Sequence, residues 1–250
     1  MTIALFITCL TDQFYPRSGI AVVKVLEHLG HRVVYPEAQT CCGQPLFNNG
    51  YHADARDLAR RMIRVFGQYE TIVTPSASCA AMIRQHYPSL FASGSDERTE
   101  AEALAKNTYE FVEYLVKVQD VDLHALGVTW QGKATYHYSC HLRDLGTDDD
   151  SQHLIGQIQG MDYHPLSQPQ QCCGFGGTFA VKYPQISTAM VRDKVEDIRA
   201  TGAGTLVCNE AGCSMNIAGA CRRDGLDIRT KSLAEIIAEG LGLLDPEGEA

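Results

Sequence analysis

The sequence predicts an α/β protein made of two similar halves, each a mainly parallel sheet flanked by helices. Short apolar strands alternate with amphipathic helices along the chain, a pattern typical of parallel βαβ units. The order of these segments, and of the cysteines among them, occurs twice with an offset of about 131 residues. We therefore expect two pseudo-symmetric, Rossmann-like repeats with cysteines at the carboxyl ends of the strands.

Most of the elements expected in the first half recur in the second. In the first half they are, in chain order, a strand at residues 3–9, a helix at 17–29, a strand at 31–36, a helix at 54–66 and a strand at 71–74. In the second half they are strands at 134–140 and 161–165, a helix at 186–200 and a strand at 205–208. The strands are short apolar runs, and the helices carry apolar residues three and four positions apart. Gly30 lies where a glycine commonly ends a helix.

The middle of the chain is predicted to join the two halves. The apolar spacing over residues 99–118 predicts one long amphipathic helix. Residues 119–132 then form a connection. This organisation gives a first cysteine-rich repeat at residues 1–118 and a second at residues 133–250.

Eight of the ten cysteines fall into two sets of four. In each set a lone cysteine lies 32 residues before a Cys-Cys-Gly sequence, and a last cysteine lies 37 or 40 residues after the pair. Ligands of an open parallel sheet gather at the carboxyl ends of its strands, where these cysteines are predicted to lie. We therefore expect each set to converge on one site, formed by Cys9, Cys41, Cys42 and Cys79 in the first half and by Cys140, Cys172, Cys173 and Cys213 in the second.

Four grouped thiols are the donor set of an iron–sulfur cluster or a zinc ion. Adjacent side chains of a strand point to opposite faces, so neighbouring cysteines reach one centre only where the backbone turns sharply. The glycine after each pair permits a positive φ and lets N–H groups approach the sulfur atoms. A cluster can bind adjacent cysteines through different irons, which favours it over zinc. Buried apolar thiols and disulfides are the alternatives, but they do not account for the repeated spacing.

The composition excludes several classes of protein. Of 250 residues, 45% are hydrophobic and 20% charged, as in ordinary globular proteins. With 21 basic and 30 acidic residues the formal charge is −9, which argues against a nucleic-acid partner. No apolar run approaches the roughly 18 residues of a membrane helix, and the N-terminus lacks the features of a signal peptide. We expect a cytoplasmic protein, whose ten cysteines then indicate metal binding or redox chemistry.

The duplicated motif resembles the cysteine-rich domain family with paired CCG signatures. The likeness covers residues 3 to about 244 and is strongest at 74–79, 139–142, 172–177 and 212–216. The family includes the B subunit of heterodisulfide reductase and the iron–sulfur subunit of glycolate oxidase. This short, two-repeat chain is most similar to members that serve in lactate utilisation. The resemblance implies one or two [4Fe–4S] clusters, bound by the eight cysteines.

The chain departs from the fullest family pattern, which ends each set with Cys-x-x-Cys. Here Ser76 and Glu210 stand at the first of those positions, so five-thiol ligation is in doubt. Four thiols per half suffice for a [4Fe–4S] cluster, although one half can also have kept the fold without its cluster. Glu210 is an alternative oxygen donor, but carboxylates suit harder ions. Cys208 is either a core thiol or a further ligand, Cys221 is expected to be incidental, and His141 either serves the cluster or is bonded to local backbone.

The resemblance implies an iron–sulfur electron-transfer subunit of a cytoplasmic oxidoreductase complex that oxidises L-lactate to pyruvate. The sequence contains no recognisable flavin or nicotinamide site, so the carbon chemistry would need partners, a ferredoxin-like iron–sulfur protein and a third component. Two alternatives are a cluster-based thiol–disulfide reductase of the heterodisulfide type and a non-enzymatic, zinc-stabilised assembly module. No catalytic residue is assigned.

Overall fold

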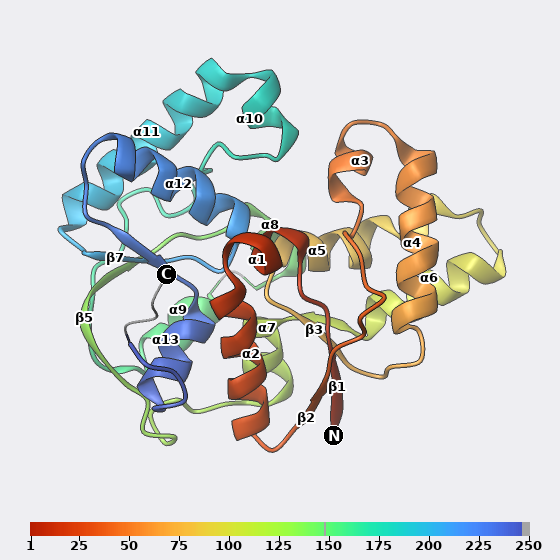
Figure 1. Cartoon of the computed structure of the whole chain (residues 1–250), viewed down its shortest axis with the longest axis horizontal. Coiled ribbons are helices and arrows are strands. Elements are labelled where there is room, and N and C mark those ends of the chain that lie inside the picture. Colours follow the sequence, from red (N-terminus) through yellow and green to blue (C-terminus); the bar gives the residue numbers. More distant parts are fainter. Residues whose placement is uncertain (148, 247–250) are drawn as a thin grey trace.

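The fold consists of two four-stranded parallel sheets, one in each half of the chain (Figure 1). The computed structural model describes residues 1–147 and 149–246. Strand order is β2-β1-β3-β4 in the first sheet and β6-β5-β7-β8 in the second, so both sheets have the same topology. The strands are β1 (Thr2–Leu5), β2 (Arg32–Val34), β3 (Ile72–Thr74) and β4 (Thr108–Glu110), then β5 (Thr129–Tyr136), β6 (Gln159–Tyr163), β7 (Thr205–Val207) and β8 (Arg229–Lys231). The predicted class, two pseudo-symmetric α/β repeats, is confirmed.

Helices make the crossovers that parallel pairing requires. In the first half they are α1 (Cys9–Phe14), α2 (Pro16–His28), α3 (Gln44–Asn48), α4 (His52–Phe66), α5 (Ala77–Ala81), the short segments Met82–His86 and Pro88–Leu90, and α6 (Asp96–Lys106). In the second half they are α8 (Cys140–Leu145), α9 (Asp150–Ile155), α10 (Thr178–Lys182), α11 (Pro184–Thr201) and α12 (Ala211–Arg223). The helices predicted at residues 17–29, 54–66 and 186–200 correspond to α2, α4 and α11.

The prediction of one helix over residues 99–118 is wrong. After α6, the segment Thr108–Glu110 forms β4 and pairs with β3. Glu110 then caps a new turn, α7 (Phe111–Glu113), because its carboxylate accepts two backbone N–H groups of that turn. A π-helical turn, Tyr114–Val118, follows. The apolar residues that gave the helical spacing therefore belong to several elements.

The first strand of each half, β1 and β5, begins and ends at other residues than predicted. β1 ends four residues before Cys9, which begins α1, and β5 ends four residues before Cys140, which begins α8. β5 starts at Thr129, within the segment predicted to connect the halves. Both lone cysteines thus lie in short loops and helix starts beyond the sheet edge, where side chains can turn toward a shared site.

The last helix of each half packs against the other half. α13 (Leu233–Gly240) lies along α2, and α7 contacts α9 (Figure 1). Buried residues from both halves form one continuous hydrophobic cluster, which includes Val22 and Leu26 of α2 and Ile236 and Ile237 of α13. The two sheets are therefore stabilised by a shared core.

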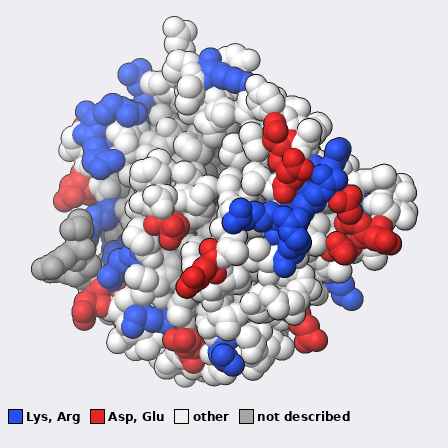
Figure 2. All heavy atoms as spheres, turned by 45° about the vertical axis from the view of Figure 1, so that its right-hand side comes forward, with Lys and Arg blue, Asp and Glu red and all other residues white. Residues whose placement is uncertain are grey.

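The face that carries α4 and α6 has a mixed charge pattern. Figure 2 shows basic side chains interspersed with acidic ones on this side of the molecule. On α4, Arg60 pairs with Asp57 at 2.9 Å and with Glu97 at 2.7 Å. Within residues 1–147 and 149–246, no helix combines the length and apolar character needed to cross a membrane.

A buried carboxylate links α13 to its surroundings. The side chain of Glu239 is 1% exposed and pairs with Arg17 of α2 at 3.0 Å and with Lys231 of β8. It also accepts a hydrogen bond from the indole N–H of Trp130 at 3.2 Å. Removing the carboxylate would leave two cationic groups partly buried without a counter-charge.

Glu239→Ala is expected to lower the free energy of unfolding by about 3 kcal/mol, because Lys231 and Arg17 lose their buried counter-charge. Glu196→Ala is a matched control, since Glu196 pairs with Arg199 on α11 and both side chains are well exposed, at 70% and 61%. The control should lose less than about 1 kcal/mol. Urea unfolding measures both variants, and equal losses would contradict a special role of Glu239 in joining the halves.

Candidate metal centres

The eight cysteines of the two sets lie beyond the carboxyl ends of the strands. Cys9 and Cys140 begin α1 and α8, which follow β1 and β5. Cys79 lies in α5 after β3, and Cys213 lies in α12 after β7. The two Cys-Cys-Gly sequences occupy the loops after β2 and β6. Each set thus gathers thiols from three separate segments of the chain.

In the first half, the four thiols form a continuous chain of contacts. The Sγ atoms of Cys42 and Cys79 are 3.3 Å apart. Cys41 lies within hydrogen-bonding distance of both Cys42 and Cys9, and the N–H of Gly43 donates to its sulfur at 3.4 Å. Cys42 and Cys79 are buried, Cys41 is half-buried and Cys9 is exposed. The site is therefore closest to solvent at Cys9.

The second half repeats this arrangement. The Sγ atoms of Cys173 and Cys213 are 3.1 Å apart. Cys172 lies within hydrogen-bonding distance of Cys140 and Cys173, and the N–H of Gly174 donates to its sulfur at 3.4 Å. Cys173 and Cys213 are buried, whereas Cys140 and Cys172 are half-buried. The predicted convergence of distant cysteines is therefore present in both halves.

One thiol in each set is much more acidic than its neighbours. Hydrogen bonds from Cys42 and Cys9 lower the pKa of Cys41 to about 3, and a hydrogen bond from Cys140 lowers the pKa of Cys172 to about 2. The same contacts with Cys41 raise the pKa of Cys9 and of Cys42. Cys41 and Cys172 are therefore the first thiols to ionise in their sets, because the thiols hydrogen-bonded to them stay protonated and stabilise the thiolate. A metal cation would provide the positive charge that lets the remaining thiols ionise.

The turn after each cysteine pair depends on glycine. Gly43 has a φ of 86° and Gly174 a φ of 79°, as expected from the sequence. A Cβ atom on Gly43 would have no neighbour closer than 3.5 Å, whereas one on Gly174 would lie 2.8 Å from the carbonyl oxygen of Ser187. The second turn therefore packs more tightly on its following helix.

The helices α4 and α11 occupy equivalent places in the two halves, but they differ in one buried side chain. Gly43 is next to Leu58 of α4 and Gly174 is next to Met190 of α11. Four residues further on, α4 has Met62 and α11 has Lys194, and both side chains are fully buried. The Lys194 ammonium donates to a backbone carbonyl at 2.8 Å, and burial lowers its pKa. The second site thus has a buried lysine where the first has an apolar side chain.

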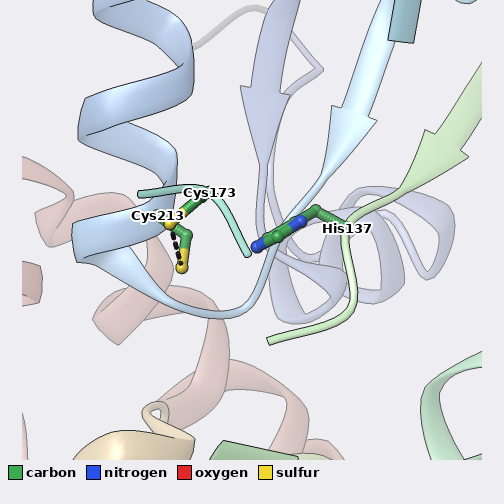
Figure 3. A group of neighbouring side chains, drawn as sticks. All are labelled: His137, Cys173 and Cys213. Carbon is green, nitrogen blue, oxygen red and sulfur yellow. Dashed lines mark hydrogen bonds between the residues drawn. The ribbon is translucent and has the colours of Figure 1, made fainter. Parts of the chain in front are cut away.

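A second difference lies at the ends of β1 and β5. The N–H groups of Phe6 and His137 each donate to the third strand of their own sheet at 2.9 Å, so the two residues are equivalent. The imidazole of His137 points toward Cys173 and Cys213, and the donor atoms of the three residues lie within 4.8 Å of one another (Figure 3). Burial lowers the pKa of His137 to about 3, so the ring is neutral at neutral pH. The sequence analysis missed His137, although aligning the two strand-to-cysteine segments places it opposite Phe6.

Ser76 and Glu210 bond to each other between the halves. The hydroxyl of Ser76 donates to the Glu210 carboxylate at 3.0 Å, and Ser78 donates to it through its N–H and its hydroxyl, each at 3.1 Å. These contacts engage both carboxylate oxygens, so Glu210 acts as an acceptor between the halves. Cys208 is buried, and its thiol is within hydrogen-bonding distance of Cys213, at the margin of the second set.

The two sites are connected by direct polar contacts. Gln44, which follows the first Cys-Cys-Gly, has its Nε2 3.3 Å from Nε2 of His141, and it also donates to the carbonyl of Ser78 at 3.2 Å. Nδ1 of His141 lies 3.7 Å from the sulfur of Cys140. A short series of side chains therefore leads from the first cysteine turn to the second set.

The sequence profile of the cysteine-rich (CCG) domain matches residues 3–84 and 134–218, and each match contains one complete set of four cysteines. The chain belongs to the cysteine-rich CCG domain family. It is 44% identical to Lactate utilization protein A of Shouchella clausii, over 95% of this chain and 98% of that protein. It is 43% identical to Lactate utilization protein A 2 of Bacillus cereus strain AH820, over 96% and 99%. The resemblance inferred from the sequence is confirmed.

The residues present fit a soft metal or a cluster. Thiolate ligands select zinc, copper(I) and iron–sulfur clusters over harder ions. Backbone N–H groups already point at sulfur in both turns, as they do around sulfur-ligated metals. The exposed Cys9 and the half-buried Cys140 would complete each donor set at its outer edge.

Gly174→Ala is expected to destabilise the protein more than Gly43→Ala does. Alanine at a positive φ costs about 1–2 kcal/mol at either position. At Gly174 the close approach to the Ser187 carbonyl adds about 1–3 kcal/mol of overpacking. Urea unfolding of both variants under reducing conditions measures the difference, and equal losses would contradict the tighter packing of the second turn.

Proposed function

We propose that this chain is an iron–sulfur electron-transfer subunit with one cluster in each half. The observation that carries this proposal is the presence of two complete four-thiol sets at equivalent strand ends. Clusters bound by four cysteines exchange single electrons. In this assignment the ligands of one [4Fe–4S] cluster are Cys9, Cys41, Cys42 and Cys79, and those of the other are Cys140, Cys172, Cys173 and Cys213.

The surrounding protein groups suit this role. The N–H groups of Gly43 and Gly174 donate to Cys41 and Cys172, and hydrogen bonds to sulfur tune the reduction potential of a cluster. The exposed position of Cys9 puts the first centre close to the surface, where a partner protein can exchange electrons with it. The buried thiols lie on the inner side and are kept from water.

The contact between Gln44 and His141 supports electron exchange between the two centres within one chain. Gln44 is two residues from Cys42, and His141 is adjacent to Cys140. Close packing of this kind shortens the path that an electron would take. We infer that the two centres act in series rather than as separate sites.

The names of the relatives associate them with lactate utilisation, and we extend that role to this chain. Oxidation of L-lactate to pyruvate releases two electrons and two protons. This cytoplasmic subunit would accept the electrons one at a time, while partners carry out the carbon chemistry. The partners we infer are a ferredoxin-like iron–sulfur protein and a third component of the same complex.

The alternatives differ in what the thiols bind. A heterodisulfide-type reductase would use the position of Ser76 and Glu210 for a further thiol, but these two residues bond to each other instead. A zinc-stabilised assembly module would need only a redox-inactive ion in each set.

Protein purified without oxygen is expected to be brown and to contain iron and acid-labile sulfide in similar amounts, since both are components of a [4Fe–4S] cluster. Metal and sulfide analysis of the full chain measures this directly. Colourless protein with stoichiometric zinc would favour the assembly module and contradict an electron-transfer role.

Cys41→Ser is expected to remove about half of the bound iron and sulfide, because it takes a ligand from the first set alone. Cys221→Ser is the control, since Cys221 is buried in α12 and belongs to neither set. The control should retain the full iron content. Unchanged iron in Cys41→Ser would refute the ligand assignment in the first half.

A further inference from the structure

We propose that His137 donates its ring N–H to sulfur of the second centre, and that this contact gives the second centre a higher reduction potential than the first. The inference rests on the proposed iron–sulfur function. The cysteine pattern alone makes the two sites equivalent, whereas this contact would give them different reduction potentials.

His137 and the two thiols that it faces come from three separate segments of the chain. His137 follows the end of β5, Cys173 lies in the loop before α10, and Cys213 lies in α12. Figure 3 shows the imidazole directed at the two thiols, and the donor atoms lie within 4.8 Å of one another. A ring nitrogen in this position is close enough for an N–H group to interact with sulfur after a small adjustment.

The imidazole is buried without any other partner. His137 is 1% exposed, and neither of its ring nitrogens has a hydrogen-bond partner among residues 1–147 and 149–246. An unsatisfied buried polar group is unfavourable because it has lost its hydrogen bonds to water without replacement. Such groups are few in native structures, and a redox role or an ion beside the group is one of the explanations for them. Negatively charged sulfur beside the ring would satisfy its N–H group and offset this cost.

The first centre has no equivalent donor in this place. Phe6 stands where the second half has His137, and its ring packs edge-on against Phe66 with centroids 5.6 Å apart. His141 is also near the second set, but its ring already contacts Gln44 on one side and Cys140 on the other. His137 therefore gives the inner part of the second site a potential N–H donor at a place where the first site has a phenylalanine ring.

The buried amine of Lys194 near the second set acts in the same direction. Hydrogen bonds to cluster sulfur stabilise the more negative, reduced state and so raise the reduction potential. Lys194 is buried on α11, where it feels the charges of Cys172, Cys173 and Cys213, whereas the first half has Met62 at that position. Electrons that enter at the exposed Cys9 side would therefore pass from the first centre to the second.

Redox titration of anaerobically purified protein, followed by electron paramagnetic resonance, tests the proposal. Cys41→Ser isolates the second centre and Cys172→Ser isolates the first, and the second should have the higher midpoint potential. In the Cys41→Ser background, His137→Phe introduces the residue of the first half and should lower that potential without loss of iron. His137→Gln retains an N–H donor and should restore part of the shift. Phe6→Leu, in the Cys172→Ser background, removes no donor and should leave the first centre unchanged.

Pulsed measurements of nitrogen coupling identify the contact. A weak ¹⁴N coupling to the second centre that is lost in His137→Phe and kept in His141→Phe supports the hydrogen bond. A strong coupling typical of direct ligation overturns it, as does the absence of any coupling sensitive to His137. Equal midpoint potentials in the two isolated centres also overturn it, with the electron-transfer function intact. Protein without any cluster refutes the proposed function and this inference together.

Discussion

The close packing of four thiols in each half is the constraint on which the two sites depend. Hydrogen bonds between the sulfur atoms lower the pKa of one thiol in each set, and together with burial they raise the pKa of the thiols bonded to it. Such a group is stable with its protons or with a cation, and a cluster or metal ion supplies the cation. The short strands and the glycine turns bring the sulfur atoms into contact, and backbone N–H groups donate hydrogen bonds to them. The fold around them supplies the rigidity that keeps the thiols from separating.

The duplication gives two sites of one geometry and different surroundings. Each half contributes the same strand order and the same cysteine placement, yet the inner side of the second site has His137 and Lys194 where the first has Phe6 and Met62. The contacts of Ser76 with Glu210 and of Gln44 with His141 then connect the halves close to the thiols. Packing of α13 on α2 fixes the relative position of the two sheets. The proposed electron transfer between two centres would require such a fixed arrangement.

Much of the fold could be predicted because its signals are local. The spacing of apolar residues gave α2, α4 and α11, and glycine identified both cysteine turns. The prediction of a helix at residues 99–118 was wrong because residues 108–110 form a strand that pairs with β3. This pairing joins segments that are distant in the sequence, and the spacing of apolar residues does not report it. The two sets of cysteines could likewise be predicted from their spacing. His137 and Lys194 could be identified only from the structure, in which the sheet hydrogen bonds and the glycine contacts show which residues of the two halves are equivalent. A buried polar residue in an apolar position is a weak signal in a single sequence and a clear one in a structure.

X-ray absorption at the iron edge, on protein purified without oxygen, tests the central claim most directly. A cluster in each thiol set predicts sulfur atoms as the nearest neighbours of iron, together with iron neighbours beyond them. An absence of iron neighbours, or a metal content made up of zinc alone, would contradict the claim that these thiols assemble around iron–sulfur clusters.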